Sequence, residues 1–165
     1  MRKTIIGVMG PGTQAHEVDI QHAEELGALI AQAGWVLLTG GRKIGVMDAA
    51  SRGAKNAYGL TLGILPTADL DSLSDAVDIV IRTDLGNARN NINVLSSDVV
   101  IACGMGAGTA SEVALALKNG KPVILLNNNQ DCEKFFKGLS PEKIFVVTTA
   151  KEAIHRVKAI LSNAV

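Results

Sequence analysis

The chain has 165 residues, of which 16 are basic and 16 acidic, so its formal net charge is +0. This length is typical of a single domain, and the balanced charge excludes the broad basic surface of a nonspecific nucleic-acid binder. The apolar share of 47% excludes a disordered chain, and an aromatic share of 3% is too small for the stacking platforms that bind single strands. We therefore expect one domain over residues 1–165 that does not bind nucleic acid.

Short apolar runs alternate along the chain with segments in which apolar residues recur at helical spacing. In chain order, the pattern predicts a strand at residues 4–9, a helix at 20–33, a strand at 35–39, a helix at 46–57, strands at 60–65 and 78–82, a helix at 88–96, a strand at 99–103, a helix at 109–118, a strand at 122–126, a short helix at 132–137, a strand at 144–147 and a helix at 150–161. Strands that are apolar on both faces and separated by helices are typical of a parallel sheet covered on both sides. The predicted fold class is α/β, a doubly wound, Rossmann-like domain whose mostly parallel sheet has about seven strands.

No segment approaches the ~20 consecutive apolar residues of a membrane span, and the strand-like pattern begins at the first residues, where a signal peptide would stand. We therefore expect a cytoplasmic protein that makes no membrane contact. Cys103 and Cys132 form neither a CxxC pair nor a zinc-ligand spacing, and His16, His22 and His155 form no metal-binding pair. The sequence thus predicts no metal site and a buried structural thiol at Cys103.

Three glycine-rich turns follow the first, second and fifth predicted strands. They are the first turn Gly10-Pro11-Gly12-Thr13, the second turn Gly40-Gly41-Arg42-Lys43 and the third turn Gly104-Met105-Gly106-Ala107-Gly108-Thr109. In doubly wound sheets, ligands bind beyond the carboxyl ends of the strands, and the free N–H groups of a helix start attract anions. We therefore predict a site for a phosphate-bearing small molecule, with contacts from Gly10, Gly12, Thr13, Gly40, Gly41, Gly106, Ala107, Gly108 and Thr109.

The first turn also matches the dinucleotide fingerprint G-x-G-x-x-A at Gly10, Gly12 and Ala15. That site needs an acidic residue after the second strand to hold the ribose hydroxyls, but Thr39-Gly40-Gly41-Arg42 stands there. The pattern disfavours an NAD enzyme, and the absence of a G-x-x-x-x-G-K-[ST] motif disfavours a P-loop nucleoside triphosphatase.

The residues around the second and third turns resemble the LOG family of nucleotide phosphoribohydrolases. Gly106-Ala107-Gly108-Thr109-Ala110-Ser111-Glu112 is similar to that family's PGGxGTxxE signature, and Gly40-Gly41 with Gly45-Val46-Met47 is similar to its GGG-x-x-GLM stretch. The resemblance aligns Arg89 and Glu112 with the catalytic arginine and glutamate of the hydrolases. Gly104-Met105 replaces the Pro-Gly of the signature, and Asn90 replaces the lysine after the arginine. The loss of that cation disfavours hydrolysis.

Within this superfamily, the resemblance is closer to the short branch that contains the molybdenum cofactor carrier proteins. It rests on Gly7-Val8-Met9-Gly10-Pro11-Gly12, on the run from Gly45 to Ala54, on Gly63-Ile64-Leu65-Pro66 and on Gly86-Asn87-Ala88-Arg89-Asn90. The resemblance implies an oligomeric binder that holds the pterin cofactor, protects it from oxidation and delivers it to molybdenum enzymes or cofactor biosynthesis proteins. The small residues at positions 49–57 allow close helix packing between subunits, as in a homodimer or homotetramer.

For the site, these observations leave two principal hypotheses. In the first, the cofactor phosphate rests on the helix start at residues 106–109, with Arg42, Arg89, Asn90 and Glu112 around the remainder. In the second, Arg89 and Glu112 assist departure of the base from an AMP-like nucleotide, giving free base and ribose 5-phosphate. A nucleotide-sensing module is a third class. Purely structural roles are also open, a capping box with Thr109 for Glu112 and a surface ion pair for Arg89.

Overall fold

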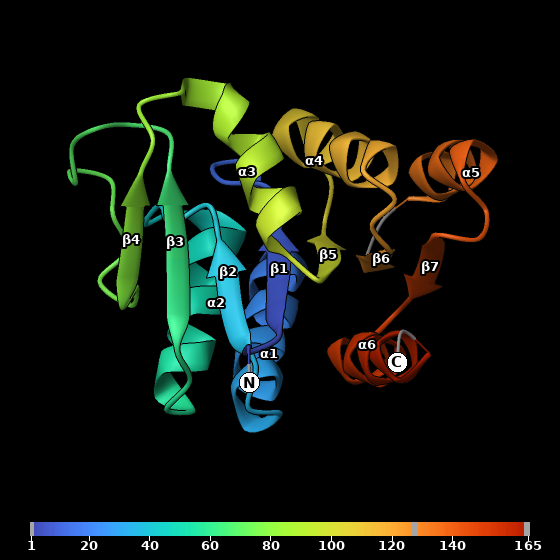
Figure 1. Cartoon of the computed structure of the whole chain (residues 1–165), viewed down its shortest axis with the longest axis horizontal. Helices are drawn as coiled ribbons and strands as arrows, with labels where there is room; N and C mark the ends of the chain where they lie inside the picture. Colours follow the sequence, from blue (N-terminus) through green and yellow to red (C-terminus); the bar gives the residue numbers. More distant parts are fainter. Residues whose placement is uncertain (1, 127–128, 164–165) are drawn as a thin grey trace.

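The computed structural model describes residues 2–126 and 129–163, and in these ranges seven strands form one parallel sheet (Figure 1). The strands are β1 (Ile5–Met9), β2 (Val36–Thr39), β3 (Thr61–Leu65), β4 (Ile79–Arg82), β5 (Val99–Cys103), β6 (Val123–Leu126) and β7 (Ile144–Val147). Their order is β4-β3-β2-β1-β5-β6-β7, and every pair of neighbours is parallel. The predicted doubly wound α/β fold is confirmed, and the strand order reverses between β1 and β5.

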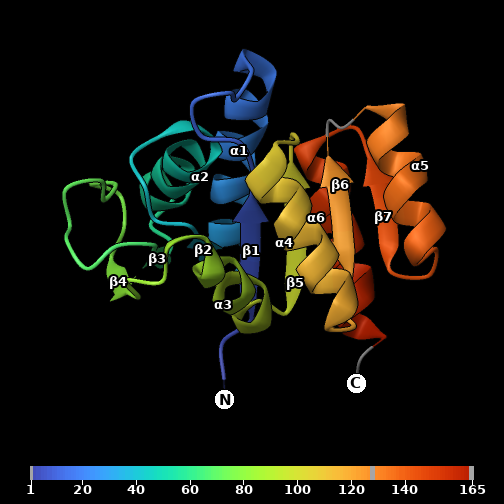
Figure 2. The same cartoon turned by 90° about the horizontal axis from the view of Figure 1, so that it is seen from above.

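Helices cover both faces of the sheet, as Figures 1 and 2 show. The helices are α1 (Glu17–Gln32), α2 (Gly45–Asn56), α3 (Arg89–Ser96), α4 (Ala107–Lys118), α5 (Gln130–Leu139) and α6 (Ala150–Ser162), and a 3₁₀ turn, η1 (Gly86–Ala88), precedes α3. One apolar core joins α1, α2 and α6 to the sheet, and the second joins α3, α4 and α5 to the opposite face. In the described ranges, none of the helices combines the length and apolar character that crossing a membrane would require.

The burial of the strands explains how well their sequence pattern predicts them. Every residue of β5 and β6 is buried, so both strands appear in the sequence as uninterrupted apolar runs. β5 and β7 have the predicted bounds, and the other strands differ from the prediction by one residue at the amino end. The largest shift is at the start of α1, which begins at Glu17 and not at residue 20. α4 begins two residues earlier than predicted, and α5 extends two residues further at each end.

The small residues of α2 pack against α1 within the chain, so they are not free for the close packing between subunits that their size would allow. A Cβ built on Gly53 would lie 2.0 Å from the carbonyl oxygen of Glu24, and one built on Gly27 would lie 2.0 Å from that of Ala50. These contacts join α2 to α1, and Ala49, Ala50 and Ala54 are buried in the same core. The close packing is therefore between α1 and α2 of the same chain, which cover one face of the sheet together with α6.

Candidate functional site

The three glycine-rich turns meet at the carboxyl edge of the sheet, beside the point where the strand order reverses. A pocket of about 400 Å³ lies between them, within the usual range for small-molecule sites. Twelve of the thirteen predicted site residues line it: Gly10, Gly12, Thr13, Gly40, Arg42, Arg89, Asn90, Gly106, Ala107, Gly108, Thr109 and Glu112. The structure thus brings together three turns that begin at Gly10, Gly40 and Gly104, far apart in the sequence.

Gly41, the thirteenth predicted residue, lies behind the pocket wall. It is buried, its N–H donates to Thr39 Oγ1 at 3.1 Å, and its φ of +76° is in the left-handed region. A Cβ at this position would lie 3.1 Å from the Cα of Gly63 in β3. Gly41 therefore shapes the second turn, but it does not line the pocket.

The pocket also has lining residues that the sequence did not predict as site residues. They are Val8, Met9, Pro11, Gln14, Ile44, Met47 and Asn87. Met47 lies in the run from Gly45 to Ala54 that carries the family resemblance, and Asn87 lies two residues before Arg89. Their proximity to these motifs is the sequence feature that could have indicated a place in the pocket. Met9, Ile44 and Met47 give the pocket an apolar wall suited to a flat heterocycle.

The third turn opens α4 and forms the polar wall of the pocket. Gly106 is the N-cap, with extended φ and ψ of −143° and 176°, and the helix begins at Ala107. The N–H groups of a first helical turn have no intrahelical acceptors, and the helix dipole favours an anion there. A Cβ built on Gly108 would meet no atom within 4 Å, so the approach to these N–H groups is open.

Thr109, in the same turn, has a hydroxyl that is buried without a protein partner. Its Oγ1 is one of three buried side-chain polar atoms that lack a hydrogen bond among the residues the structure describes, and the residue is 2% exposed. An unsatisfied buried hydroxyl costs about 1–3 kcal/mol, so such groups are rare without a functional reason. Thr109 also lines the pocket, so this hydroxyl lies at its wall.

Arg89 extends from the start of α3 to the carboxyl ends of two neighbouring strands. Its Nη1 donates to the carbonyl oxygen of Gly40 at 2.5 Å and also to that of Ile64. The pKa of Arg89 is lowered, mainly by burial and also by the positive charge of Arg42, while the negative charge of Glu112 opposes this shift. The alternative of a surface ion pair is wrong, because the side chain is buried and bound to backbone carbonyls in the pocket wall.

Glu112 is a buried acid in the pocket wall, and the capping-box alternative is wrong for it. Gly106 is the N-cap, so Glu112 lies a turn too far along α4 to cap the helix. Its Oε1 accepts a hydrogen bond of 2.9 Å from Asn93 Nδ2. Burial raises the pKa of Glu112 to about 7, against the bond from Asn93 and the charge of Arg89, which both lower it. The carboxyl group can thus accept or donate a hydrogen bond near neutral pH.

The cysteines and histidines take no part in this site. Cys103 is buried in the core, its thiol donates to the carbonyl oxygen of Asp19 at 3.4 Å, and burial raises its pKa. His16 is the N-cap of α1. In residues 2–126 and 129–163 there is no group of three or more His, Cys, Asp or Glu side chains that could hold a metal ion.

A family model described as the SLOG cluster4 family matches residues 3–154. The chain belongs to this family. Among solved structures, this SLOG cluster4 protein is similar to the molybdenum cofactor binding protein of the phototrophic bacterium Rippkaea orientalis, with 61% identity and a TM-score of 0.96 over 98% of this chain and 99% of that one. It is also similar to the molybdenum cofactor carrier protein of Chlamydomonas reinhardtii, with 54% identity and a TM-score of 0.94 over 98% and 99% of the two chains.

A more distant relative of this SLOG cluster4 protein is named for an enzymatic activity. It is the cytokinin riboside 5′-monophosphate phosphoribohydrolase of Mycobacterium tuberculosis, 30% identical over 135 residues, which are 74% of this chain and 70% of that protein. These likenesses confirm the predicted resemblance to the LOG superfamily and to the branch of molybdenum cofactor carriers. At the lysine position of the hydrolases, Asn90 donates from Nδ2 to Ser111 Oγ at 2.9 Å, so a neutral amide ties α3 to α4 there.

Proposed function

We propose that the protein binds the molybdenum cofactor in the pocket between the three turns, shields it and carries it without turnover. The observation that carries this proposal is the 61% identity, over 98% of the chain, to a protein named for binding that cofactor. A chain this similar over its whole length has the same walls available to the same class of ligand. The cofactor offers two recognisable parts, a phosphate ester and a flat pterin, and the pocket has a wall suited to each.

The proposed phosphate site is the first turn of α4. The N–H groups of Ala107 and Gly108 and the unpartnered hydroxyl of Thr109 supply donors there. Arg42 and Arg89 line the same pocket and add positive charge. The set of backbone donors, one hydroxyl and two guanidinium groups is the usual composition of a phosphate site.

The proposed pterin site lies between the apolar wall and the buried acid. Met9 and Met47 offer polarizable surfaces for the ring system, and the Glu112 carboxylate can accept from the ring N–H groups. Among the pocket-lining residues that the structure describes, none is a cysteine. We therefore propose that the protein holds the phosphate and the pterin and leaves the molybdenum to the sulfur donors of the cofactor itself.

Direct binding tests the carrier proposal. Cofactor released under anaerobic conditions and dialysed against the purified protein should bind saturably at micromolar protein, and binding should weaken with added salt. Arg89→Ala should lower the affinity about tenfold, because it removes a buried cation from the pocket. Arg2→Ala is the matched control, since Arg2 pairs with Asp98 at 2.7 Å and lies outside the pocket. A lack of saturation, or an equal loss in both variants, would contradict the proposal.

Hydrolysis of a nucleoside 5′-monophosphate is a second candidate, and one observation favours it. Burial raises the pKa of Glu112 to about 7 against the opposing charge of Arg89, so the carboxyl group is partly protonated near neutral pH, as a general acid would require. The hydrogen bonds of Arg89 to Gly40 and Ile64 commit part of its guanidinium to the protein, which favours binding over catalysis. Release of adenine from AMP that stops in Glu112→Ala would establish the enzyme, and its absence would leave the carrier.

The proposal also has a cellular side. We place the protein in the cytoplasm, where it would deliver the cofactor to molybdenum enzymes or receive it from cofactor biosynthesis proteins. Transfer can be tested by incubating the loaded protein with a purified cofactor-free molybdenum enzyme. Recovery of that enzyme's activity, in step with loss of cofactor from the carrier, supports delivery.

We further propose that the protein is a homodimer or homotetramer that covers the outer face of β4. Ile79 and Ile81 pair with Leu62 and Ile64 of β3 and share their side of the sheet, yet they are 47% and 43% exposed. Figure 1 shows no helix over this edge strand. Light scattering of the wild-type protein should give a mass that is a multiple of the chain mass. Ile81→Asp should reduce this mass, and an unchanged mass in the variant would contradict the interface.

A further inference from the structure

The connection between β3 and β4, residues 66–78, crosses to a parallel strand without a helix, and we call it the strap. It lies against the second turn through paired backbone bonds. Lys43 N–H donates to the carbonyl oxygen of Ser72 at 2.7 Å, and Ser74 N–H donates to that of Gly41 at 2.9 Å. Arg42 and Leu73 lie opposite each other in an isolated antiparallel bridge. The backbone that carries Arg42 into the pocket wall is therefore held by the strap.

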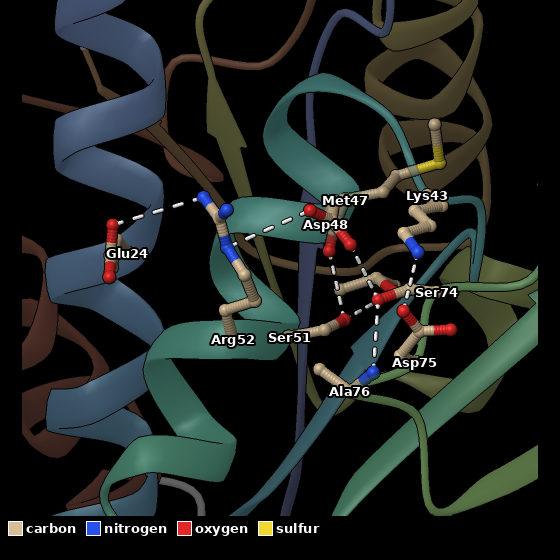
Figure 3. A network of polar contacts seen from close by, with 10 residues as sticks. Glu24, Lys43, Met47, Asp48, Ser51, Arg52, Ser74, Asp75 and Ala76 are labelled. Atoms are coloured by element: carbon tan, nitrogen blue, oxygen red, sulfur yellow. Dashed lines mark hydrogen bonds and ion pairs between the residues drawn. The ribbon is translucent and has the colours of Figure 1, made fainter.

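Ser74 is the centre of the contact between the strap and α2, as Figure 3 shows. It is 1% exposed, its Oγ donates to Asp48 Oδ1 at 2.6 Å, and the same Oγ accepts from Ala76 N–H at 3.2 Å. Asp48, in the first turn of α2, also faces Arg52, whose Nε lies 3.6 Å from its Oδ2. One buried hydroxyl thus connects the strap to the start of α2.

The start of α2 is fixed in turn to the first glycine turn. Val46 N–H donates to the carbonyl oxygen of Pro11 at 3.1 Å, and a Cβ built on Gly45 would lie 2.3 Å from that of Gly12. The segment of residues 41–48 is therefore held between the first turn and the strap. Arg42 lies in this segment, its side chain is exposed to the pocket, and its charge reaches Arg89 across the pocket.

We propose that Ser74 is a positioning residue for Arg42: its hydroxyl bond to Asp48 keeps the second turn ordered, so that the guanidinium is presented to the anionic part of the ligand. This inference rests on the proposed function of the pocket. Arg42 has an exposed side chain on a short turn. Without the strap, this turn would become ordered only when the ligand binds, and the entropy lost would reduce the affinity. The strap supplies that order before the ligand arrives.

The first part of the test needs no ligand. In Ser74→Ala, ¹⁵N relaxation should show lower order parameters at the amides of residues 41–43, while the amides of residues 107–109 in α4 keep their values. Asp48→Ala removes the acceptor of the same hydrogen bond and should give the same result. The test can therefore be made with either variant if the other folds poorly. Arg52→Ala is the matched control, because it removes the 3.6 Å pair with Asp48 and keeps the bond between Asp48 and Ser74.

The second part is a double-mutant cycle with the molybdenum cofactor as the probe. Ser74→Ala should weaken binding about fivefold in the wild-type background and leave it unchanged in an Arg42→Ala background, because the hydroxyl acts through Arg42. A general loss of structure would weaken binding equally in both backgrounds. Equal losses, or unchanged order at residues 41–43 in both strap variants, would overturn the inference. If the wild-type protein does not bind the cofactor, the proposed function fails, and the relaxation data alone decide whether Ser74 orders the turn.

Discussion

The two walls of the pocket are built in different ways. The wall formed by α4 takes its donors and its acid from Gly106 to Glu112, seven consecutive positions at one helix start, and both Thr109 and Glu112 are buried. The wall formed by the second turn has an exposed arginine, and contacts from the strap, about 30 residues away in sequence, hold its backbone. Burial determines the chemistry of the first wall, whereas long-range packing determines the geometry of the second.

If this comparison is right, steric change at the second wall should cost the most stability. Gly45 has a φ of +56°, and a Cβ there would lie 2.3 Å from the carbonyl oxygen of Gly12 and 2.4 Å from that of Pro11. We expect Gly45→Ala to lower the free energy of unfolding by about 3 kcal/mol, from backbone strain and overpacking together. Urea unfolding of the variant measures this loss.

Two other glycines separate these causes. Gly120 also has a positive φ, +68°, but a Cβ there meets no atom within 4 Å, so Gly120→Ala should cost only the backbone part, about 1 kcal/mol. Gly108→Ala in the α4 wall has open space and helical backbone, and it should leave stability unchanged or slightly higher. A loss in Gly108→Ala as large as that in Gly45→Ala would remove the distinction between the walls.

The buried acid of the α4 wall should reveal itself in the pH dependence of stability. Burial raises the pKa of Glu112 from 4.5 to about 7, so the unfolded state releases this proton at a lower pH than the folded state does. The free energy of unfolding therefore falls as the pH rises from 4.5 to 7, by an amount on the order of 3 kcal/mol, because only the unfolded state has released the proton in this range. Glu112→Gln should remove this loss, and its advantage over the wild type should level off above pH 7.

Asp98 provides a control of opposite sign. Burial raises the pKa of Asp98, but bonds from Arg2 and from the N–H of Ile5 outweigh burial and leave it lowered. Its contribution is therefore lost as the pH falls below 4, and Asp98→Asn should be most harmful near neutral pH. If Glu112→Gln and Asp98→Asn gave the same dependence, the burial of Glu112 would not be the cause.

The two walls also differ in how far the sequence could predict them. β5 and the third turn were predicted because an uninterrupted apolar run followed by glycines is a local signal, and Glu112 followed from the motif. The contact of Ser74 with Asp48 joins segments 26 residues apart with no periodic pattern, so the sequence could not predict it. Met47 was missed as a lining residue for the same reason, since the direction of α2 depends on the contact of Gly45 with the first turn.

A further and modest effect concerns the unpartnered hydroxyl of the α4 wall. Thr109→Val keeps the shape of the side chain and removes a buried Oγ1 that has no hydrogen bond in the protein. The ligand-free variant should therefore be more stable than the wild type by about 1 kcal/mol, because it no longer desolvates an unsatisfied polar group.

The same substitution should weaken binding of the cofactor, because the phosphate loses one donor. Thr109→Ser keeps the hydroxyl and should retain most of the affinity, so it is the matched control for lost packing. Gain of stability together with loss of affinity is the signature of a group held ready for a ligand. A variant that lost stability without losing affinity would show instead that Thr109 serves the fold, and the α4 wall would then owe its anion site to backbone N–H groups alone.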